Sequence, residues 1–87
     1  MKSILQTEKF CYICSTTNWL ESHHCFGGSN RKVSERYGLK VWLCKKHHME
    51  AHEGGKLTEH LHRVGQQEFE KTRHRTEFMK VFGRNYL

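Results

Sequence analysis

The sequence predicts a small α+β domain that is stapled by zinc and ends in a helical tail. A chain of 87 residues buries only about 60–65% of its unfolded surface, so a core alone leaves it marginally stable. Four cysteines and eight histidines offer ligands for a staple, and two short apolar segments precede a helical pattern. We expect one domain over residues 1–87, with a metal-binding core at about 9–55 and a helical tail at about 56–87.

The first half of the chain is predicted to form a tight turn and two strands. A Cys-x-x-Cys turn occupies residues 11–14. Residues 19–26 (WLESHHCF) and 39–44 (LKVWLC) have the aromatic and apolar content of short strands. Residues 27–38 (GGSNRKVSERYG) lie between them and are polar and basic, which is typical of a loop.

The second half is predicted to be helical. One helix begins at Lys45 and ends at residues 54–55, where two glycines can supply a left-handed cap. Gly65 marks a break in the next pattern, whose apolar residues recur at helical spacing: Leu57, Leu61, Val64 and Phe69. A last short helix is expected to start at Thr76, whose hydroxyl can cap it, and to stop at Gly83.

The composition is basic, with 15 Lys and Arg against nine Asp and Glu, a net charge of +6 and a pI near 9.4. Such a balance favours a polyanionic partner, although charge alone does not establish one. No apolar run approaches the roughly 20 residues of a membrane span, and residues 1–10 lack the features of a secretory signal. We therefore expect no membrane association and a cytoplasmic location, where cysteines serve as metal ligands rather than disulfides.

A structural zinc site is predicted from two ligand pairs of equal spacing. Cys11 and Cys14 form the first pair, and Cys44 and His47 form the second at the start of a helix. Four such ligands can surround zinc as a tetrahedron. The alternative is that the spacing is a coincidence of free thiols and a surface histidine. Cys25 is predicted to be a small buried side chain and not a fifth ligand.

A second metal site is predicted from the remaining histidines. His48 and His52 are one helical turn apart, on a face rotated by about 100° from His47. With His23 from the neighbouring strand they offer three imidazoles and leave coordination positions open for water and a phosphate oxygen. His24 points to the other face of the strand and is available as a general base. Taken singly, each histidine has the alternative of being merely solvated or hydrogen-bonded.

The segments "CYIC", "ESHH" and "LCKKHHMEAH" together resemble the HNH endonucleases. In that family a ββα-metal (His-Me finger) motif is built on a treble-clef zinc knuckle. The resemblance covers Cys11 to His52, and the segments "YGLKVWLC" and "FGRNYL" look like those of small phage or prophage members. It implies His23 as the first ligand of the catalytic ion, His24 as the general base, and His48 and His52 as the helix ligands.

The chain departs from the family pattern at the middle asparagine, which braces the loop that orients the base. Leu39 stands about where that asparagine falls, and Asn30 is the only nearby candidate. Either Asn30 acts from another point in the loop, or backbone groups replace it.

The resulting expectation is a metal-dependent endonuclease that hydrolyses DNA phosphodiester bonds. One divalent ion (Mg²⁺, Mn²⁺, Ni²⁺ or Zn²⁺) would polarise the scissile phosphate while His24 activates water. The family resemblance implies 5′-phosphate and 3′-hydroxyl ends. Arg31, Lys32 and Arg36 are the candidates for contacts with backbone phosphates, their alternative being a solvated loop.

Two other functions stay open at this point. The main alternative is a non-catalytic treble-clef zinc module that binds nucleic acid, and the second is a protein-interaction adaptor. The oligomeric state is also open, a homodimer included. The helical tail can act as a lid, as a dimer surface or as a DNA contact through four residues: Lys71, Arg73, His74 and Arg75.

Overall fold

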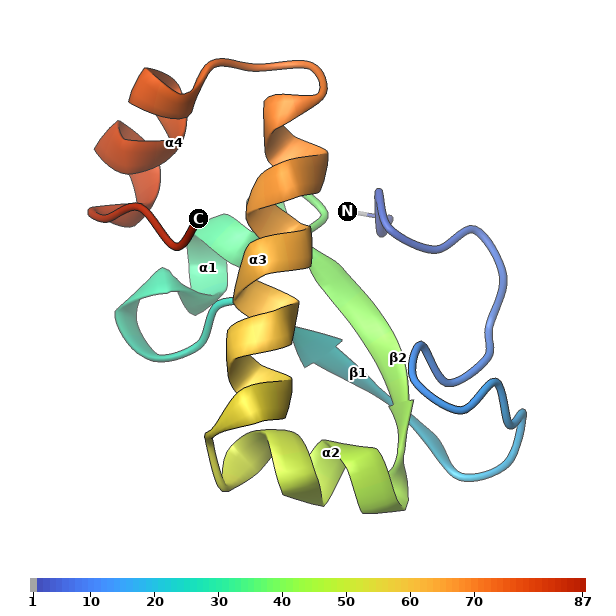
Figure 1. Cartoon of the computed structure of the whole chain (residues 1–87). Coiled ribbons are helices and arrows are strands. Elements are labelled where there is room, and N and C mark those ends of the chain that lie inside the picture. Colours follow the sequence, from blue (N-terminus) through green and yellow to red (C-terminus); the bar gives the residue numbers. More distant parts are fainter. Residues whose placement is uncertain (1) are drawn as a thin grey trace.

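The computed structural model describes residues 2–87 and confirms the α+β class. Its elements, in chain order, are β1 (Leu20–His24), the 3-10 helix η1 (Gly28–Asn30), α1 (Arg31–Arg36), β2 (Lys40–Cys44), α2 (Lys45–His52), α3 (Lys56–Glu70) and α4 (Arg75–Phe82). In Figure 1, α2 lies at the end of the sheet where β2 finishes, and α3 runs back toward α4. No helix within residues 2–87 has the length and apolar character needed to cross a membrane.

The two strands pair antiparallel and decide which way the adjacent histidines face. His23 lies opposite Val41, and His24 lies opposite Lys40. Side chains alternate along a strand, so His23 shares a face with Val41 and His24 takes the other face. Val41 is 2% exposed. His23 is therefore on the inner face of the sheet and His24 on the outer face.

The segment between the strands is helical, whereas its composition led us to expect a loop. It contains η1 and α1. Ser34 in α1 is fully buried, and its hydroxyl donates to the Leu39 carbonyl (2.5 Å) and accepts from the Phe26 N–H (3.3 Å). These bonds tie the helix to the ends of both strands. Tertiary contacts of this kind stabilise short helices that local sequence does not predict.

The α2 helix ends as predicted, but α3 does not break at Gly65. Gly54 and Gly55, with φ of 83° and 87°, separate α2 from α3. Gly65 lies inside α3, where an added Cβ would be 2.9 Å from Cε2 of Phe26 and 3.1 Å from Cβ of Cys25. Glycine at this position therefore permits a close approach between α3 and the chain that follows β1.

The last helix has a different start from the one expected. It begins at Arg75, with His74 as N-cap and no side-chain capping bond, so the Thr76 cap is wrong. Thr76 lies inside the first turn of the helix. Its end is as predicted, because Gly83 adopts the left-handed conformation (φ 87°) and its N–H donates to the Met79 carbonyl (2.8 Å).

Aromatic rings join the tail to the rest of the molecule. Phe78 and Phe82 of α4 are buried. Phe82 lies 4.6 Å from Phe26 and Phe78 lies 5.3 Å from Phe69, measured between ring centroids. Aromatic pairs at such distances contribute beyond the area they bury. The helical tail is thus part of the core of the molecule.

Candidate functional site

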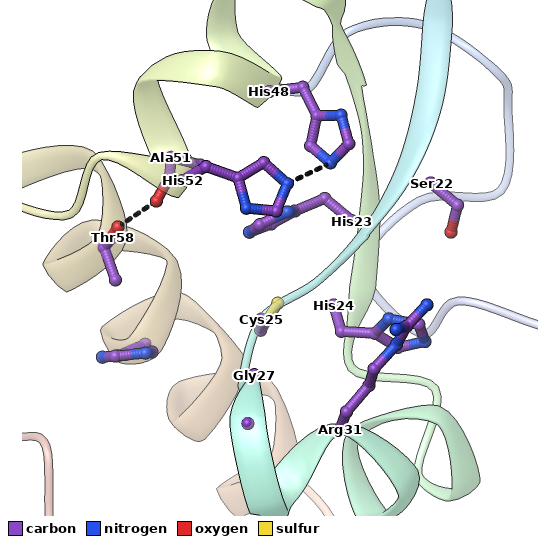
Figure 2. Close-up of a pocket in the computed structure, with 12 residues that line it drawn as sticks. Ser22, His23, His24, Cys25, Gly27, Arg31, His48, Ala51, His52 and Thr58 are labelled. Carbon is purple, nitrogen blue, oxygen red and sulfur yellow. Dashed lines mark hydrogen bonds between the residues drawn. The ribbon is translucent and has the colours of Figure 1, made fainter.

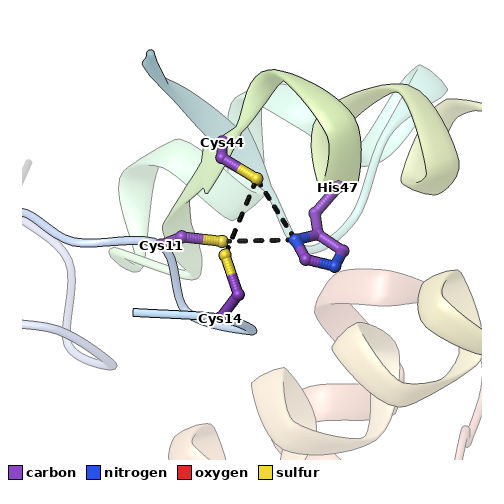
Figure 3. A group of neighbouring side chains, drawn as sticks. All are labelled: Cys11, Cys14, Cys44 and His47. Atoms are coloured by element: carbon purple, nitrogen blue, oxygen red, sulfur yellow. Dashed lines mark hydrogen bonds between the residues drawn. The ribbon is translucent and has the colours of Figure 1, made fainter. Parts of the chain in front are cut away.

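Three cysteines and one histidine converge where the N-terminal turn meets β2 and α2 (Figure 3). Cys14 Sγ lies 3.8 Å from Cys44 Sγ, and His47 Nδ1 lies 3.6 Å from Cys11 Sγ and 3.2 Å from Cys44 Sγ. Tetrahedral zinc, with bonds of about 2.3 Å to sulfur and 2.0 Å to nitrogen, needs ligand atoms roughly 3.5–3.8 Å apart. The four predicted ligands can therefore hold a structural metal ion such as zinc.

The backbone around Cys11 favours the thiolate form. Burial raises the pKa of this thiol, but N–H groups of Cys14, Cys44 and Ile13 hydrogen-bond to the sulfur and bring the pKa down to about 6. Ser15 adopts a φ of 66° and donates its N–H to the Cys11 carbonyl (2.8 Å), which closes the turn. The deprotonated sulfur is the form that binds zinc.

Cys25 lies outside this cluster, as expected. It is 3% exposed, and burial raises the pKa of its thiol to about 12. It packs under Gly65 of α3. Cys25 is therefore a small buried side chain.

Three histidines form a second cluster (Figure 2). His23 comes from β1, and His48 and His52 come from successive turns of α2. The Nε2 atoms of His48 and His52 are 3.1 Å apart, and the His23 ring stands edge-on to both rings. Nitrogens bound to one ion at about 2.0–2.1 Å are roughly 3.0–3.4 Å apart. The structure thus brings together the three residues predicted as ligands of a second ion.

The surroundings of this cluster favour ligand-competent imidazoles. Burial, together with the neighbouring histidines, lowers the pKa of His23 to about 4. His23 is therefore neutral at pH 7, as a ligand must be. Glu21 Oε1 lies 3.2 Å from His48 Nδ1, so a carboxylate stands beside the ring nitrogen of His48 that does not face His52. Sequence reasoning missed Glu21, although its place two residues before His23, on the same strand face, was a usable signal.

On the outer face of the sheet, His24 is held by a carboxylate from α1. Its Nε2 lies 2.8 Å from Glu35 Oε1, and Lys40 Nζ lies 2.7 Å from Glu35 Oε2. Hydrogen bonds from Lys40 and His24 hold the pKa of Glu35 well below its usual range. The ionised carboxylate accepts a hydrogen bond from the Nε2–H of His24, and the lone pair of the neutral ring is then on Nδ1, an arrangement that orients an imidazole base. Sequence reasoning missed Glu35, because the helix that carries it was expected to be a loop.

The chain that follows β1 is braced by backbone groups and a serine. The Cys25 N–H donates to the Leu39 carbonyl (2.9 Å), and the Ser34 hydroxyl donates to the same carbonyl. Asn30 has a different partner, because its Nδ2 donates to the Phe82 carbonyl (3.1 Å) and links η1 to α4. These bonds to the Leu39 carbonyl hold the chain after β1, and a catalytic role for Asn30 stays a prediction.

An open hollow of about 400 Å³ connects the two faces around the edge strand β1. Its lining includes the three clustered histidines and also His24, Arg31 and His62. Figure 2 shows Arg31 and His24 on one side of this hollow and the histidine cluster on the other. Of the three cations predicted to contact phosphates, Arg31 lines the hollow, whereas Lys32 and Arg36 are exposed elsewhere on α1.

The predicted basic contacts of the tail are largely neutralised. Three cations near the α3–α4 turn form ion pairs: Lys71 with Glu68 (2.6 Å), Arg73 with Glu77 (2.8 Å) and Arg75 with Glu70 (3.2 Å). His74 is the N-cap residue of α4. Cations already paired with carboxylates attract phosphate less strongly than unpaired ones.

Comparisons with protein-family models, with curated proteins and with solved structures find no match to this chain. What the protein does therefore has to be inferred from the two clusters and the hollow beside them. The first cluster has the ligand set of a structural site, and the second borders open space.

Proposed function

We propose that the protein is a metal-dependent endonuclease that hydrolyses DNA phosphodiester bonds. One observation carries the proposal: three clustered imidazoles and a separately oriented histidine line the same open hollow. A structural site needs no open space, whereas a hydrolytic site needs room for water and substrate. The Cys11, Cys14, Cys44 and His47 cluster would hold the structural zinc that stabilises this arrangement.

In this proposal the residues of the hollow have separate tasks. His23, His48 and His52 would hold the divalent ion, which when bound supplies Lewis-acid activation of the scissile phosphate. His24, oriented by Glu35, takes a proton from the attacking water at Nδ1. Arg31 lies at the side of the hollow and is suited to hold a phosphate oxygen, because its guanidinium offers several donors.

DNA is proposed as substrate because of charge. The net charge of +6 favours a polyanion, and Arg31 adds positive charge at the hollow itself. Contacts with phosphates carry no sequence information. We therefore expect binding that depends strongly on salt and only weakly on base sequence.

One observation favours the alternative of a non-catalytic zinc module that binds nucleic acid. The Asn30 amide is engaged by the Phe82 carbonyl, so the chain lacks a side-chain amide at the position where the resemblance implies one. Ser34 and the Leu39 backbone supply a brace instead. The two functions therefore differ in whether the protein cleaves DNA, and only the nuclease requires His24 for it.

The test is plasmid nicking by His24→Ala, with His60→Ala as the matched control. His60 is an exposed histidine of α3 outside the hollow. His24→Ala should bind metal and DNA like the parent but nick about 100-fold more slowly, the usual scale of general-base catalysis. His60→Ala should nick at the parental rate. Equal rates for His24→Ala and the parent would overturn the assigned base.

A further inference from the structure

A second hollow, of about 440 Å³, adjoins the first on the side of the C-terminal tail. The two hollows share His62 in their linings. Arg63 from α3 also lines the second hollow, as do Arg84 and Tyr86 from the chain after α4. A strand of nucleic acid that occupies the first hollow can therefore continue past His62 into the second.

His62 is held rigidly at this boundary. Its ring lies parallel to that of Phe26 (4° between planes, 5.1 Å between centroids) and 4.5 Å from the ring of Tyr86. Burial and then the charge of Arg84 lower the pKa of His62. The imidazole is therefore neutral at pH 7 and keeps one N–H donor in a fixed ring orientation.

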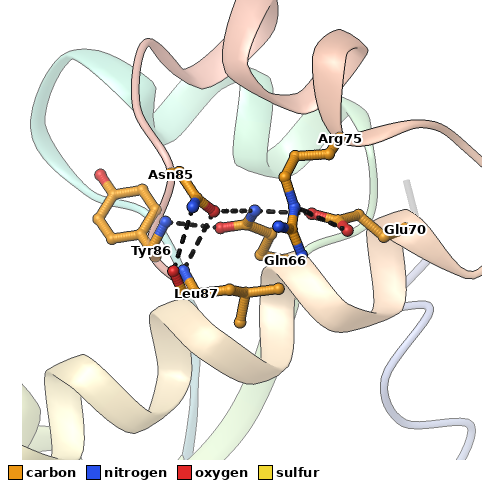
Figure 4. Close-up of polar contacts among 6 residues, drawn as sticks. All are labelled: Gln66, Glu70, Arg75, Asn85, Tyr86 and Leu87. Carbon is orange, nitrogen blue, oxygen red and sulfur yellow. Dashed lines mark hydrogen bonds and ion pairs between the residues drawn. The ribbon is translucent and has the colours of Figure 1, made fainter.

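The tail that carries Arg84 and Tyr86 is fixed to α3 by a buried amide (Figure 4). Gln66 is fully buried. Its Nε2 donates to Asn85 Oδ1 (2.7 Å) and Glu70 Oε2 (2.6 Å), and its Oε1 accepts the Tyr86 N–H (2.8 Å). A buried amide whose groups are all satisfied makes a network rigid. The second hollow is thus preorganised and does not depend on a flexible tail.

The cations of this hollow are unpaired, unlike those of the α3–α4 turn. Within residues 2–87, neither Arg63 nor Arg84 lies within ion-pair distance of a carboxylate. The guanidinium of Arg84 lies 4.8 Å from the centre of the Tyr86 ring, a contact that orients it without neutralising it. Glu59 and Leu87 also line the hollow, and Arg63 and Arg84 are the positively charged side chains among its lining residues.

We propose that this second hollow is a phosphate subsite, in which Arg84, Arg63 and the N–H of His62 hold a backbone phosphate of the DNA strand whose scissile phosphate lies in the first hollow. The inference rests on the proposed function, because it assumes that the scissile phosphate of the same strand occupies the first hollow. It extends that function by assigning the tail a part in substrate binding. It also selects different cations from the four that sequence reasoning suggested.

The test is DNA binding by Arg84→Gln, with Lys80→Gln as the matched control. Lys80 is an exposed cation of α4 outside both hollows, so both variants lose one charge. Binding of a fluorescent duplex to the zinc-loaded protein, with no further ion added, is measured over a series of salt concentrations. Loss of one phosphate contact should reduce the slope of log K against log salt by about one for Arg84→Gln. Lys80→Gln should keep the parental slope.

Two further variants keep the test decisive. Arg63→Gln changes an exposed side chain of α3 and should repeat the loss of slope, so it replaces Arg84→Gln if that variant melts early. His62→Phe keeps the ring stack and removes the N–H, so it should weaken binding with the slope unchanged. Parental affinity and slope in Arg84→Gln, Arg63→Gln and His62→Phe would overturn the subsite.

Plasmid nicking by the same proteins separates this inference from the proposed function. If the salt dependence of DNA binding by the parent depends on Arg84, but the parent does not nick DNA with any divalent ion tested, the subsite stands and the proposed nuclease function fails. If the parent nicks and all three variants bind and nick as it does, the nuclease stands and the subsite fails.

Discussion

At the scale of single residues, two carboxylates lie beside histidines that line the first hollow. Glu21 lies 3.2 Å from His48 Nδ1, and Glu35 lies 2.8 Å from His24 Nε2. The hydrogen bond with Glu35 engages Nε2 of His24 and leaves its Nδ1 unengaged by Glu35. His48 directs Nε2 at His52 (3.1 Å), and Glu21 lies beside its Nδ1. The two histidines thus differ in which ring nitrogen faces a carboxylate.

The role of Glu21 can be tested through metal affinity. Glu21→Gln should weaken the divalent ion at the histidine cluster by about 10–100-fold, because partners behind a ligating histidine tune its orientation and basicity. Calorimetric titration of the zinc-loaded protein measures this. Glu50→Gln, an exposed carboxylate of α2, is the control and should bind like the parent. Equal affinities in the two variants would show that Glu21 does not position His48.

The two clusters of candidate ligands could be predicted from the sequence, and the contact between His24 and Glu35 could not. His48 and His52 are one turn apart, and Cys44 and His47 are three residues apart, so helix geometry alone brings each pair together. Glu35 acts on His24 across 11 positions. That contact depends on α1 being a helix, which is stabilised by the buried Ser34 and not by its local sequence.

At the scale of elements, α2 contributes to both clusters because neighbouring side chains of the helix point in different directions. His47 turns toward the cysteines, and His48, one position later, turns toward β1. The helix is anchored between them by Ala51, which is 6% exposed and whose carbonyl accepts from the Thr58 hydroxyl (2.7 Å). A shift of α2 would therefore disturb both clusters at once.

The approach of α3 to the chain after β1 depends on Gly65. Gly65→Ala would place a Cβ 2.9 Å from Phe26 and 3.1 Å from Cys25, and Phe26 is 1% exposed and cannot move aside. We expect a loss of about 1–3 kcal/mol in the free energy of unfolding, the usual cost of overpacking. Urea denaturation measures it. Gln67→Ala, on the exposed side of the same helix, should change stability by less than about 0.5 kcal/mol.

The strands and helices with strong periodicity could be predicted, but the meaning of Gly65 could not. Its position suggested a helix break, because glycine is unfavourable inside helices. The reason for glycine here is the ring of Phe26, which lies 39 positions away in the sequence. A contact of that range is visible only once the tertiary packing is known.

At the scale of the whole molecule, the first cluster joins the N-terminal turn to the sheet and α2. Cys11 and Cys44 are separated by 33 positions, and a metal bound between them would close that long loop. Structural zinc contributes on the order of 10 kcal/mol of binding energy to folding. Small domains in general gain only a few kcal/mol from a hydrophobic core alone.

Zinc content and thermal unfolding test this staple together. Cys44→Ser should lose the bound zinc and the cooperative thermal transition, because one of four ligands is removed. Cys25→Ala is the control, since Cys25 is buried away from the cluster, and it should keep one zinc per chain at a lower melting temperature. A Cys44→Ser protein that keeps its zinc and melts like the parent would show that the cluster is no staple.

The helices of the tail could be predicted from the sequence, but the ion pairs of its cations could not. Its helices were expected, but Lys71, Arg73 and Arg75 could not be recognised as paired with glutamates. Their partners are three to five residues away, and for Arg73 three glutamates lie within that range. Packing determines which cation stays unpaired. For example, Gln66 donates a hydrogen bond to Asn85, and this bond holds the segment that carries Arg84.

The most direct test of the proposed nuclease activity is the initial rate of plasmid nicking, measured against the concentration of added divalent ion. The zinc-loaded parent and His48→Ala are compared with Mg²⁺, Mn²⁺, Ni²⁺ and further Zn²⁺. For the parent we predict a saturable, ion-dependent rate with at least one of these ions. For His48→Ala the ion concentration that gives half of the maximal rate should be about 10–100-fold higher, because one of the three proposed ligands is lost. A folded, zinc-loaded parent that nicks with none of these ions would contradict the account.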